Sequence, residues 1–304
     1  MRRNTFLVTG TPRSGTTVVG DILGLAPSTV TLYEPMNGDS GDRSVDRYFE
    51  IPGAHGYSKK SFADLVSRVS RLDLKLRPGN FAHETGLRKL AKKIIGGRSR
   101  HSLRMAKLQP TAQNVIWKDP IAPFAARAFI ECTGQPVVAT FRPPHAVVAS
   151  LKRLNWTYNI QEIDDGLKGK YLSRNPMRSP DDVVEGGAAL WAMVYGELME
   201  LHEAYPDKVH FVSTEDLIDD ALPVFERLFD DLSLEMTDKI REKIVARFTP
   251  KDAPETPNGH PHSRNRDIRQ ANEYWRKILT DNEIEVVNDR VGTIREFYDT
   301  RAFA

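Results

Sequence analysis

The chain has 304 residues, of which 40% are hydrophobic and 28% are charged, and its formal net charge is +2. These values fit a folded soluble protein of one large or two modest domains and imply no general polyanion partner, so no nucleic acid is expected. The single cysteine, Cys132, excludes an intramolecular disulfide framework and is consistent with a reducing compartment. No apolar run approaches the length of a membrane span, so we expect a cytoplasmic protein that attaches at most to the inner face of a membrane.

Short β-branched runs predict five strands, with helical patterns between them. The first strand is expected at Phe6–Thr9, and a helical run containing Val18, Val19, Ile22 and Leu23 follows it. The later strands are expected at Thr29–Tyr33, Val115–Trp117, Val137–Phe141 and Val209–Ser213. Apolar strands that alternate with helices are typical of a parallel sheet with crossover helices. We therefore predict an α/β fold, a P-loop-like central parallel sheet flanked by helices, in a single domain over 1–304.

The region from about 37 to 110 shows no convincing strand pattern, and we predict that it is a helical insertion that shapes an acceptor site. Segment Leu87–Ile95 is amphipathic, and a basic run continues it to Lys107. This stretch, 87–107, carries eight basic residues and no Asp or Glu: Arg88, Lys89, Lys92, Lys93, Arg98, Arg100, Arg104 and Lys107. Either it is a solvated helix face over the core, or it meets an anionic acceptor or a membrane surface.

The segment after the first predicted strand has the spacing of a phosphate-binding loop, G-x-x-x-x-G-K-[ST]. Gly10 and Gly15 are its two glycines, and Thr17 fills the Ser/Thr position. Thr16 replaces the lysine, and the positive charge lies earlier, at Arg13. Such a loop directs backbone N–H groups and a helix N-terminus at an anion. The shifted cation argues against ATP or GTP and favours a smaller 5′-anion at the end of a nucleotide.

A second motif, R-P-P-H-A-V-V-A-S at 142–150, follows the predicted strand Val137–Phe141. The proline pair is expected to open a helix, because proline is favoured in the first helical turn. Ser150 then lies two turns into that helix. An arginine at a strand end and a hydroxyl on the next helix can hold a phosphate from two sides. The alternative is a surface arginine and an exposed serine.

Together the two motifs resemble those of sulfotransferases that use 3′-phosphoadenosine 5′-phosphosulfate (PAPS). That family carries T-x-[RK]-S-G-T-T near its N-terminus and R-x-P-x-x-x-V-x-S after a later strand, and both patterns occur here in the same order. The resemblance covers about two-thirds of the chain and omits the insertion at 37–110. It implies that the first motif holds the 5′-phosphosulfate and the second holds the 3′-phosphate. The residues it implies for cofactor binding are Thr11, Pro12, Arg13, Ser14, Gly15, Thr16, Thr17, Arg142, Ser150 and, from a later segment, Arg266.

Two shorter segments also resemble parts of this family, the first of them in carbohydrate O-sulfotransferases. Tyr33-Glu34-Pro35 is similar to their E-P, which implies that Glu34 is the base; an ordinary cap or ion pair is the alternative. Lys118 begins a K-x-P pattern, which implies a lysine near the bridging oxygen; a solvated lysine is the alternative. Cytosolic sulfotransferases carry a histidine two residues after that lysine. Pro120 stands there in this chain and leaves Glu34 as the better base.

The late segment Arg264-Asn265-Arg266, followed by Trp275-Arg276, resembles an Arg-rich loop of carbohydrate 6-O-sulfotransferases that closes over the nucleotide. Core packing is the alternative use of Trp275, and it is the use we predict for Trp191 and Tyr195 on a long helix. No carboxylate or cysteine cluster accompanies His260 and His262, so no metal site is predicted.

The sequence thus predicts a PAPS-dependent sulfotransferase that sulfates a hydroxyl of a carbohydrate or glycolipid without a metal. Its predicted catalytic residues are Glu34, Lys118 and Arg13. Two other classes stay open: a P-loop kinase or NTPase with an altered loop, and a protein that binds the nucleotide without catalysis. The kinase would need a lysine at Thr16 and an acidic residue closing a strand to hold Mg²⁺.

Overall fold

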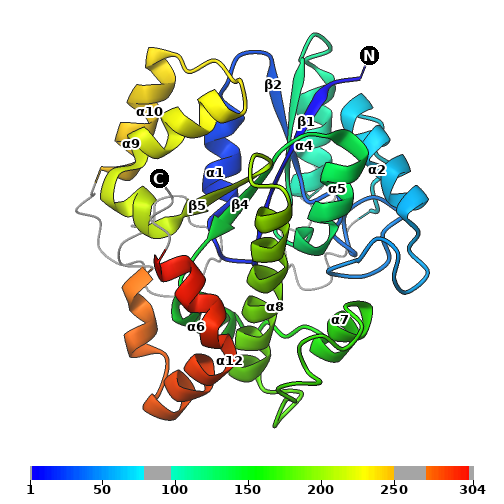
Figure 1. Cartoon of the computed structure of the whole chain (residues 1–304). Coiled ribbons are helices and arrows are strands. Elements are labelled where there is room, and N and C mark those ends of the chain that lie inside the picture. Colours follow the sequence, from blue (N-terminus) through cyan, green and yellow to red (C-terminus); the bar gives the residue numbers. More distant parts are fainter. Residues whose placement is uncertain (1, 79–96, 250–271, 301–304) are drawn as a thin grey trace, which may run out of the picture.

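The computed structural model describes residues 2–78, 97–249 and 272–300. Its centre is a five-stranded parallel sheet with the order β2-β3-β1-β4-β5 (Figure 1). The strands are β1 Asn4–Gly10, β2 Thr29–Tyr33, β3 Asn114–Lys118, β4 Val137–Phe141 and β5 Val209–Ser213. The predicted α/β fold and all five predicted strands are confirmed, with β1 and β3 one or two residues longer at each end. The middle strand is β1, so the loop that follows it opens at the centre of the sheet edge.

One face of the sheet is covered by three helices (Figure 1). Phe6 and Val8 alternate with Leu7 along β1, so they face the opposite side of the sheet from Leu7. The helices packed on the side of Phe6 and Val8 are α1 Thr16–Leu23, α9 Thr214–Asp231 and α10 Asp238–Phe248. Helix α1 begins where the predicted helical run begins, directly after the loop that follows β1.

The other face carries the larger part of the core. Trp191 and Tyr195 are fully buried there, as predicted from their helical spacing. The helices on this side are α2 Lys59–Arg71, α4 Arg98–Lys107, α5 Ala126–Thr133, α6 Pro144–Leu154, α7 Ile160–Gly166, α8 Val183–Ala204 and α12 Asp281–Thr300. The described residues also form two short 3₁₀ helices, Pro123–Ala125 and Tyr274–Lys277. Within the described ranges, none of these helices is long and apolar enough to cross a membrane.

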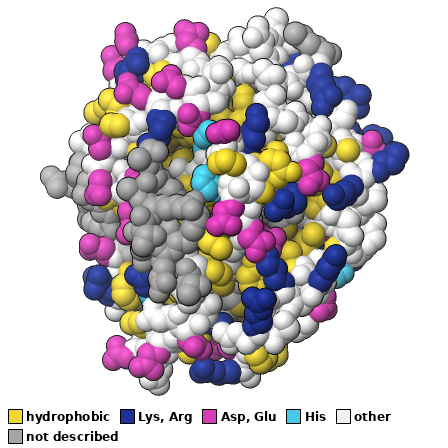
Figure 2. Space-filling model, in the orientation of Figure 1, with side chains coloured by type: hydrophobic (Ala, Val, Ile, Leu, Met, Phe, Trp, Pro, Cys, Tyr) yellow, Lys and Arg dark blue, Asp and Glu magenta, His cyan; other side chains and the backbone are white. Residues whose placement is uncertain are grey.

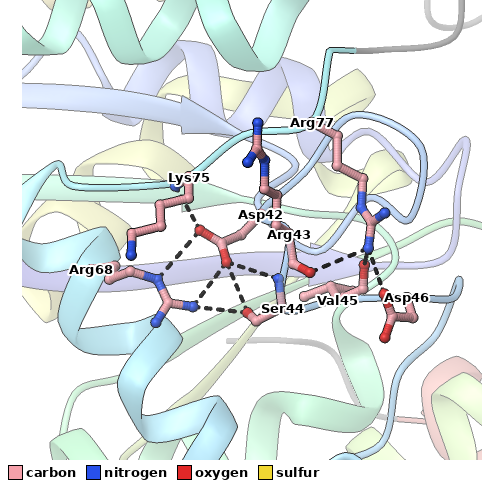
Figure 3. Close-up of polar contacts among 8 residues, drawn as sticks. All are labelled: Asp42, Arg43, Ser44, Val45, Asp46, Arg68, Lys75 and Arg77. Carbon is pink, nitrogen blue, oxygen red and sulfur yellow. Dashed lines mark hydrogen bonds and ion pairs between the residues drawn. The ribbon is translucent and has the colours of Figure 1, made fainter.

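The predicted insertion contributes α2 and α4, and no strand of the sheet lies in its described parts, 37–78 and 97–110. Segment Leu87–Ile95 lies outside the described residues, while its basic continuation forms α4. Asp42, 1% exposed, organises the described part (Figure 3). Its carboxylate accepts hydrogen bonds from the Arg68 side chain at 2.8 Å and from the Lys75 amide at 2.8 Å. Burial raises the pKa of Asp42, but these bonds and those from Ser44 hold it below the usual value.

Candidate functional site

The loop after β1 has a backbone that only certain residues adopt without strain. Gly10 has φ 149°, and a Cβ at this position would lie 2.4 Å from the carbonyl oxygen of Thr140. Gly15 has φ 97°, and Arg13, which carries a side chain, has φ 75°. A left-handed non-glycine residue costs roughly 1–3 kcal/mol and is concentrated at functional sites. The loop therefore stores strain at the one residue that supplies its cation.

Side chains beneath the loop fix its shape. The hydroxyl of Ser14, which is fully buried, donates to the Thr11 carbonyl at 2.7 Å and lies 2.7 Å from Thr140 Oγ1. Thr140 Oγ1 in turn donates to the Thr9 carbonyl at 3.1 Å. Tyr195 holds the loop from α8, since its hydroxyl lies 3.2 Å from Thr11 Oγ1. Ser14 thus supports the loop from within, and its predicted contact with the cofactor stays a prediction.

The N-terminus of α1 opens into this loop. Gly15 is the N-cap residue, and it has no side chain that could cap the helix. The first amides of a helix have no acceptor inside the helix, and here they belong to Gly15, Thr16 and Thr17. These N–H groups and the helix dipole favour an anion at this position. The structure therefore brings the predicted anion-binding residues together at the centre of the sheet edge.

The second motif lies beside the first. Arg13 Nε donates to Ser150 Oγ at 3.0 Å, which joins the loop to α6. Arg142 is 8% exposed; its Nη1 donates to the Arg13 carbonyl at 3.1 Å, and its Nε donates to Asn272 Oδ1 at 2.8 Å. Two arginines and a serine thus converge next to the helix N-terminus, in a setting suited to a second anion.

Glu34 and Lys118 form an ion pair at the ends of β2 and β3. Lys118 Nζ donates to Glu34 Oε1 at 2.9 Å, and the Lys118 side chain is only 3% exposed. Asn37 Nδ2 donates to Glu34 Oε2 at 3.1 Å. Burial raises the pKa of Glu34, but Lys118, Asn37 and Arg98 hold it below its usual value. Glu34 also has a positive φ, 54°, so it is a second strained residue at this edge of the sheet.

Asp119 directly follows Lys118 at the end of β3. It is fully buried, and its carboxylate accepts hydrogen bonds from the Met36 amide at 2.7 Å and from Trp117 Nε1 at 3.1 Å. Burial, and next the charge of Glu34, raise the pKa of Asp119 to about 7, although its hydrogen bonds act in the opposite direction. The Asp119 carboxylate therefore stabilises the turn after β3, and it is not exposed to solvent.

Two tyrosines, Tyr48 in the insertion and Tyr158 after α6, interact electrostatically with Glu34. The ring of Tyr158 packs edge-on against Phe49 at 5.0 Å and lies 6.3 Å from the ring of Tyr48. Tyr48 is 40% exposed, and its hydroxyl donates to Asp39 at 2.8 Å. Burial raises the pKa of both tyrosines, and the charge of Glu34 adds to the effect. Both phenols therefore lie within electrostatic range of the Glu34 carboxylate.

Some of the residues singled out in the sequence have no described position. Arg264, Arg266, His260 and His262 lie outside the described residues. Trp275 is described, and its ring stacks on that of His145 at 4.7 Å. Among the described residues, no group of three or more His, Cys, Asp or Glu is placed to hold a metal ion.

Sequence reasoning missed Thr140, Asn272 and Tyr158. Thr140 could have been found, because it is the one polar residue in the apolar run Val137–Phe141 and a buried hydroxyl needs a hydrogen-bond partner. Asn272 and Tyr158 belong to no motif, so the sequence carried no signal for them.

Comparisons with known proteins give likeness of structure only. No family model matches the chain, and no curated protein matches it. Retinol dehydratase in complex with androsterone and the inactive cofactor PAP is 14% identical, with a TM-score of 0.49, covering 99% of this chain and 83% of the other. Sulfotransferase STF9 from Mycobacterium avium is 13% identical, with a TM-score of 0.48 and coverage of 99% and 78%. The sulfotransferase domain from the curacin biosynthetic pathway is 14% identical, with a TM-score of 0.47 and coverage of 95% and 97%. At this level the likeness assigns no activity to the chain.

Proposed function

We propose that this protein is a PAPS-dependent sulfotransferase that transfers a sulfuryl group to an acceptor hydroxyl. The observation that carries the proposal is the convergence of three parts at one sheet edge. The first is the N-terminus of α1, which is suited to a 5′-anion. The second is the Arg13–Ser150–Arg142 group beside it, and the third is the ion pair of buried Lys118 with half-buried Glu34 at the ends of the neighbouring strands.

In this proposal the donor lies across the two motifs. The amides of Gly15, Thr16 and Thr17, together with Arg13, hold the 5′-phosphosulfate, and the backbone of Thr11 and Pro12 forms the wall of the loop. Arg142 and Ser150 hold the 3′-phosphate. Ser14 preserves the loop conformation through Thr11 and Thr140.

The reaction then follows from the charges at the site. The acceptor oxygen forms a bond to sulfur while the bond from sulfur to the bridging 5′-phosphate oxygen breaks, and the electron pair of that bond leaves with adenosine 3′,5′-bisphosphate (PAP). Glu34 takes the proton of the acceptor hydroxyl. Arg13, Lys118 and the loop amides stabilise the charge that grows on the leaving phosphate. Sulfuryl transfer resembles phosphoryl transfer, in which positioning and charge stabilisation dominate.

We further propose a sugar hydroxyl as the acceptor, free or in a glycolipid. Tyr48 and Tyr158 lie within electrostatic range of Glu34, and Asp39 accepts a hydrogen bond from the Tyr48 hydroxyl. Aromatic faces pack against the apolar faces of sugar rings, and carboxylates accept hydrogen bonds from sugar hydroxyls. A few polar groups in an aromatic wall are typical of small-molecule sites.

Helix α4 supports a contact with an anionic membrane. Met105 and Leu108 are 47% and 73% exposed at its C-terminal end, beside the exposed basic residues Arg104 and Lys107. Lysines and arginines next to exposed apolar side chains favour anionic lipid surfaces. On the face drawn in Figure 2, acidic side chains are more frequent on the left half and basic side chains on the right half, with hydrophobic side chains among them.

A co-sedimentation assay tests the membrane contact. Anionic vesicles should retain the protein at low salt and release it at high salt, because the charges are screened. The double variant Arg104→Glu, Lys107→Glu should lose retention, whereas Lys239→Glu, Lys243→Glu on α10 should keep it. Equal, negligible binding of the unchanged protein to anionic and neutral vesicles would leave a soluble acceptor.

The two alternatives are less well supported. In a P-loop kinase, an acidic residue at a strand end holds Mg²⁺; here Asp119 follows β3 but is fully buried in hydrogen bonds to the chain, and Arg142 follows β4. A protein that only binds the nucleotide would not need a buried Lys118–Glu34 pair. That alternative predicts PAP binding without sulfate transfer.

A thermal-shift panel tests the proposed donor. PAP should stabilise the protein and ATP should not, and a ligand at about 100 times its Kd adds roughly 2.7 kcal/mol to the free energy of unfolding. AMP, which lacks the 3′-phosphate, should stabilise it less than PAP. Stabilisation by ATP with Mg²⁺ but not by PAP would favour the kinase alternative.

A further inference from the structure

Glu34 and Lys118, two of the proposed catalytic residues, are bound to each other in this structure. Lys118 Nζ donates to Glu34 Oε1 at 2.9 Å, and the backbone N–H of Glu34 donates to the Lys118 carbonyl at 2.8 Å. The exposed fractions of the two side chains are 3% and 28%. The pair is therefore held by the main chain as well as by its charges, and it lies largely away from water.

The ion pair with Lys118 makes Glu34 a weaker base. A carboxylate that is bonded to an ammonium group accepts a proton less readily, because the positive charge stabilises its ionised form. Burial by itself raises the pKa of Glu34, and Lys118 is the main group that brings it below the usual value. General bases are most effective with a pKa near the working pH. Glu34 is a poor base as long as Lys118 stays bound to it.

Lys118 is also placed to respond to an anion at the loop. In the sheet it pairs with Val8, two residues before Gly10. Its stem lies against α1, since a Cβ added at Gly20 would lie 3.0 Å from Lys118 Cγ. The ammonium of a lysine is a point charge on a flexible four-carbon stem with three donors, so it can change partners without a change of backbone.

We propose that the donor nucleotide itself activates the base: its 5′-anion draws the Lys118 ammonium away from Glu34, and Glu34 then accepts the proton of the acceptor hydroxyl. This inference rests on the proposed function and adds an order to it, because the donor must bind before the acceptor is deprotonated. Among the described residues, the other charged or titratable groups that interact electrostatically with Glu34 include Arg98 on α4, Asp119 after β3, and Tyr48 and Tyr158. None of these changes partner in the proposal.

The test is a direct titration of Glu34 by NMR. Protein carrying ¹³C at the glutamate carboxyl groups is titrated with and without PAP, and the Glu34→Gln variant identifies the Glu34 signal. The pKa of Glu34 should be low in the free protein and should rise by about one unit or more when PAP binds, since loss of an opposite charge typically moves a pKa by 1–3 units. In Lys118→Met the pKa should already be raised without PAP and should change little when PAP is added.

The possible results distinguish a failure of the activation step from a failure of the proposed sulfotransferase function. An unchanged Glu34 pKa on PAP binding overturns the activation step, and so does an equal rise in Lys118→Met, which would come from the field of the nucleotide alone. Absence of PAP binding in a thermal-shift assay overturns the proposed donor, and the activation step with it. Lys118→Met leaves a buried carboxylate without its partner and is prone to misfold. Lys118→Gln, which keeps a hydrogen-bond donor beside Glu34, then serves as the second variant.

Discussion

The Nε atom of Arg13 donates to the Oγ atom of Ser150 at 3.0 Å, across 137 positions of the sequence. This contact joins the loop after β1 to helix α6 and makes one site of two separate motifs. Arg142 reinforces the junction through the Arg13 carbonyl. A ligand that contacts both motifs would therefore meet a surface that is largely formed in advance, which reduces the ordering cost of binding.

We predict that Arg142→Ala removes most of the preference for PAP over AMP. Removal of a charged hydrogen-bond partner typically costs roughly 1.5–3 kcal/mol, which corresponds to about 10- to 150-fold in affinity. Calorimetry with both nucleotides measures the preference. Arg71→Ala, an exposed arginine on α2, is the matched control and should behave as the unchanged protein. If the preference survives in Arg142→Ala, this arginine does not hold the 3′-phosphate.

Glu34→Gln is expected to bind PAP with an affinity close to that of the unchanged protein and to lose most of its turnover. Loss of a general base usually lowers a rate by about 10²–10⁴. Sulfate transfer from labelled PAPS to a panel of glycosides, with product separated by chromatography, measures the turnover. Asp64→Asn, at an exposed position on α2, controls for the loss of a carboxylate. Near-normal turnover in Glu34→Gln would reduce Glu34 to a structural role.

Gly10→Ala should destabilise the fold and abolish nucleotide binding. The added Cβ would meet the Thr140 carbonyl at 2.4 Å, so the loop or β4 must move. Gly56→Ala separates this clash from the backbone cost, because Gly56 also has a positive φ, 82°, but has nothing within 4 Å of its Cβ position. Denaturant unfolding should show a cost of roughly 1–2 kcal/mol for Gly56→Ala and a larger one for Gly10→Ala. Equal costs would show that the loop tolerates the side chain.

Glu50 gives a prediction about pH. It is 4% exposed, and burial raises its pKa to about 7, against the opposing charge of Arg47. Its folded pKa is above the unfolded value, so its contribution to stability is complete below about pH 4.3 and is lost as pH rises to about 7. Glu50→Gln, which stays neutral, should raise the free energy of unfolding at pH 8 and leave it nearly unchanged at pH 4.

Urea unfolding at the two pH values measures this difference. Glu242→Gln, at an exposed position on α10, is the control and should show no such dependence on pH. A Glu50→Gln variant that is no more stable than the unchanged protein at pH 8 would contradict the raised pKa.

The strands could be predicted because buried parallel strands appear in a sequence as short β-branched runs. The tight loop after β1 could be predicted because Gly10 and Gly15 keep a spacing that few other structures require. Side-chain contacts between neighbouring strands could not be predicted, because the order of the strands in a parallel sheet differs from their order in the sequence. For that reason Glu34 and Lys118 were found as single candidates, and their ion pair was not. Asn272, 130 positions from Arg142, has no local pattern that marks it.

The Asp42 network has a consequence for how the two sides of the proposed site depend on each other. Asp42, Arg68 and Lys75 tie the chain after β2 to α2 and to the segment beyond it, all within 37–78. The donor contacts proposed above come from the loop after β1, from Arg142 after β4 and from Ser150 on α6, all outside that block. The block is joined to the rest of the chain by ion pairs from Arg47 to Glu162 and from Lys59 to Glu131. A substitution at Asp42 should therefore disturb the proposed acceptor side of the site and leave the proposed donor contacts as they are.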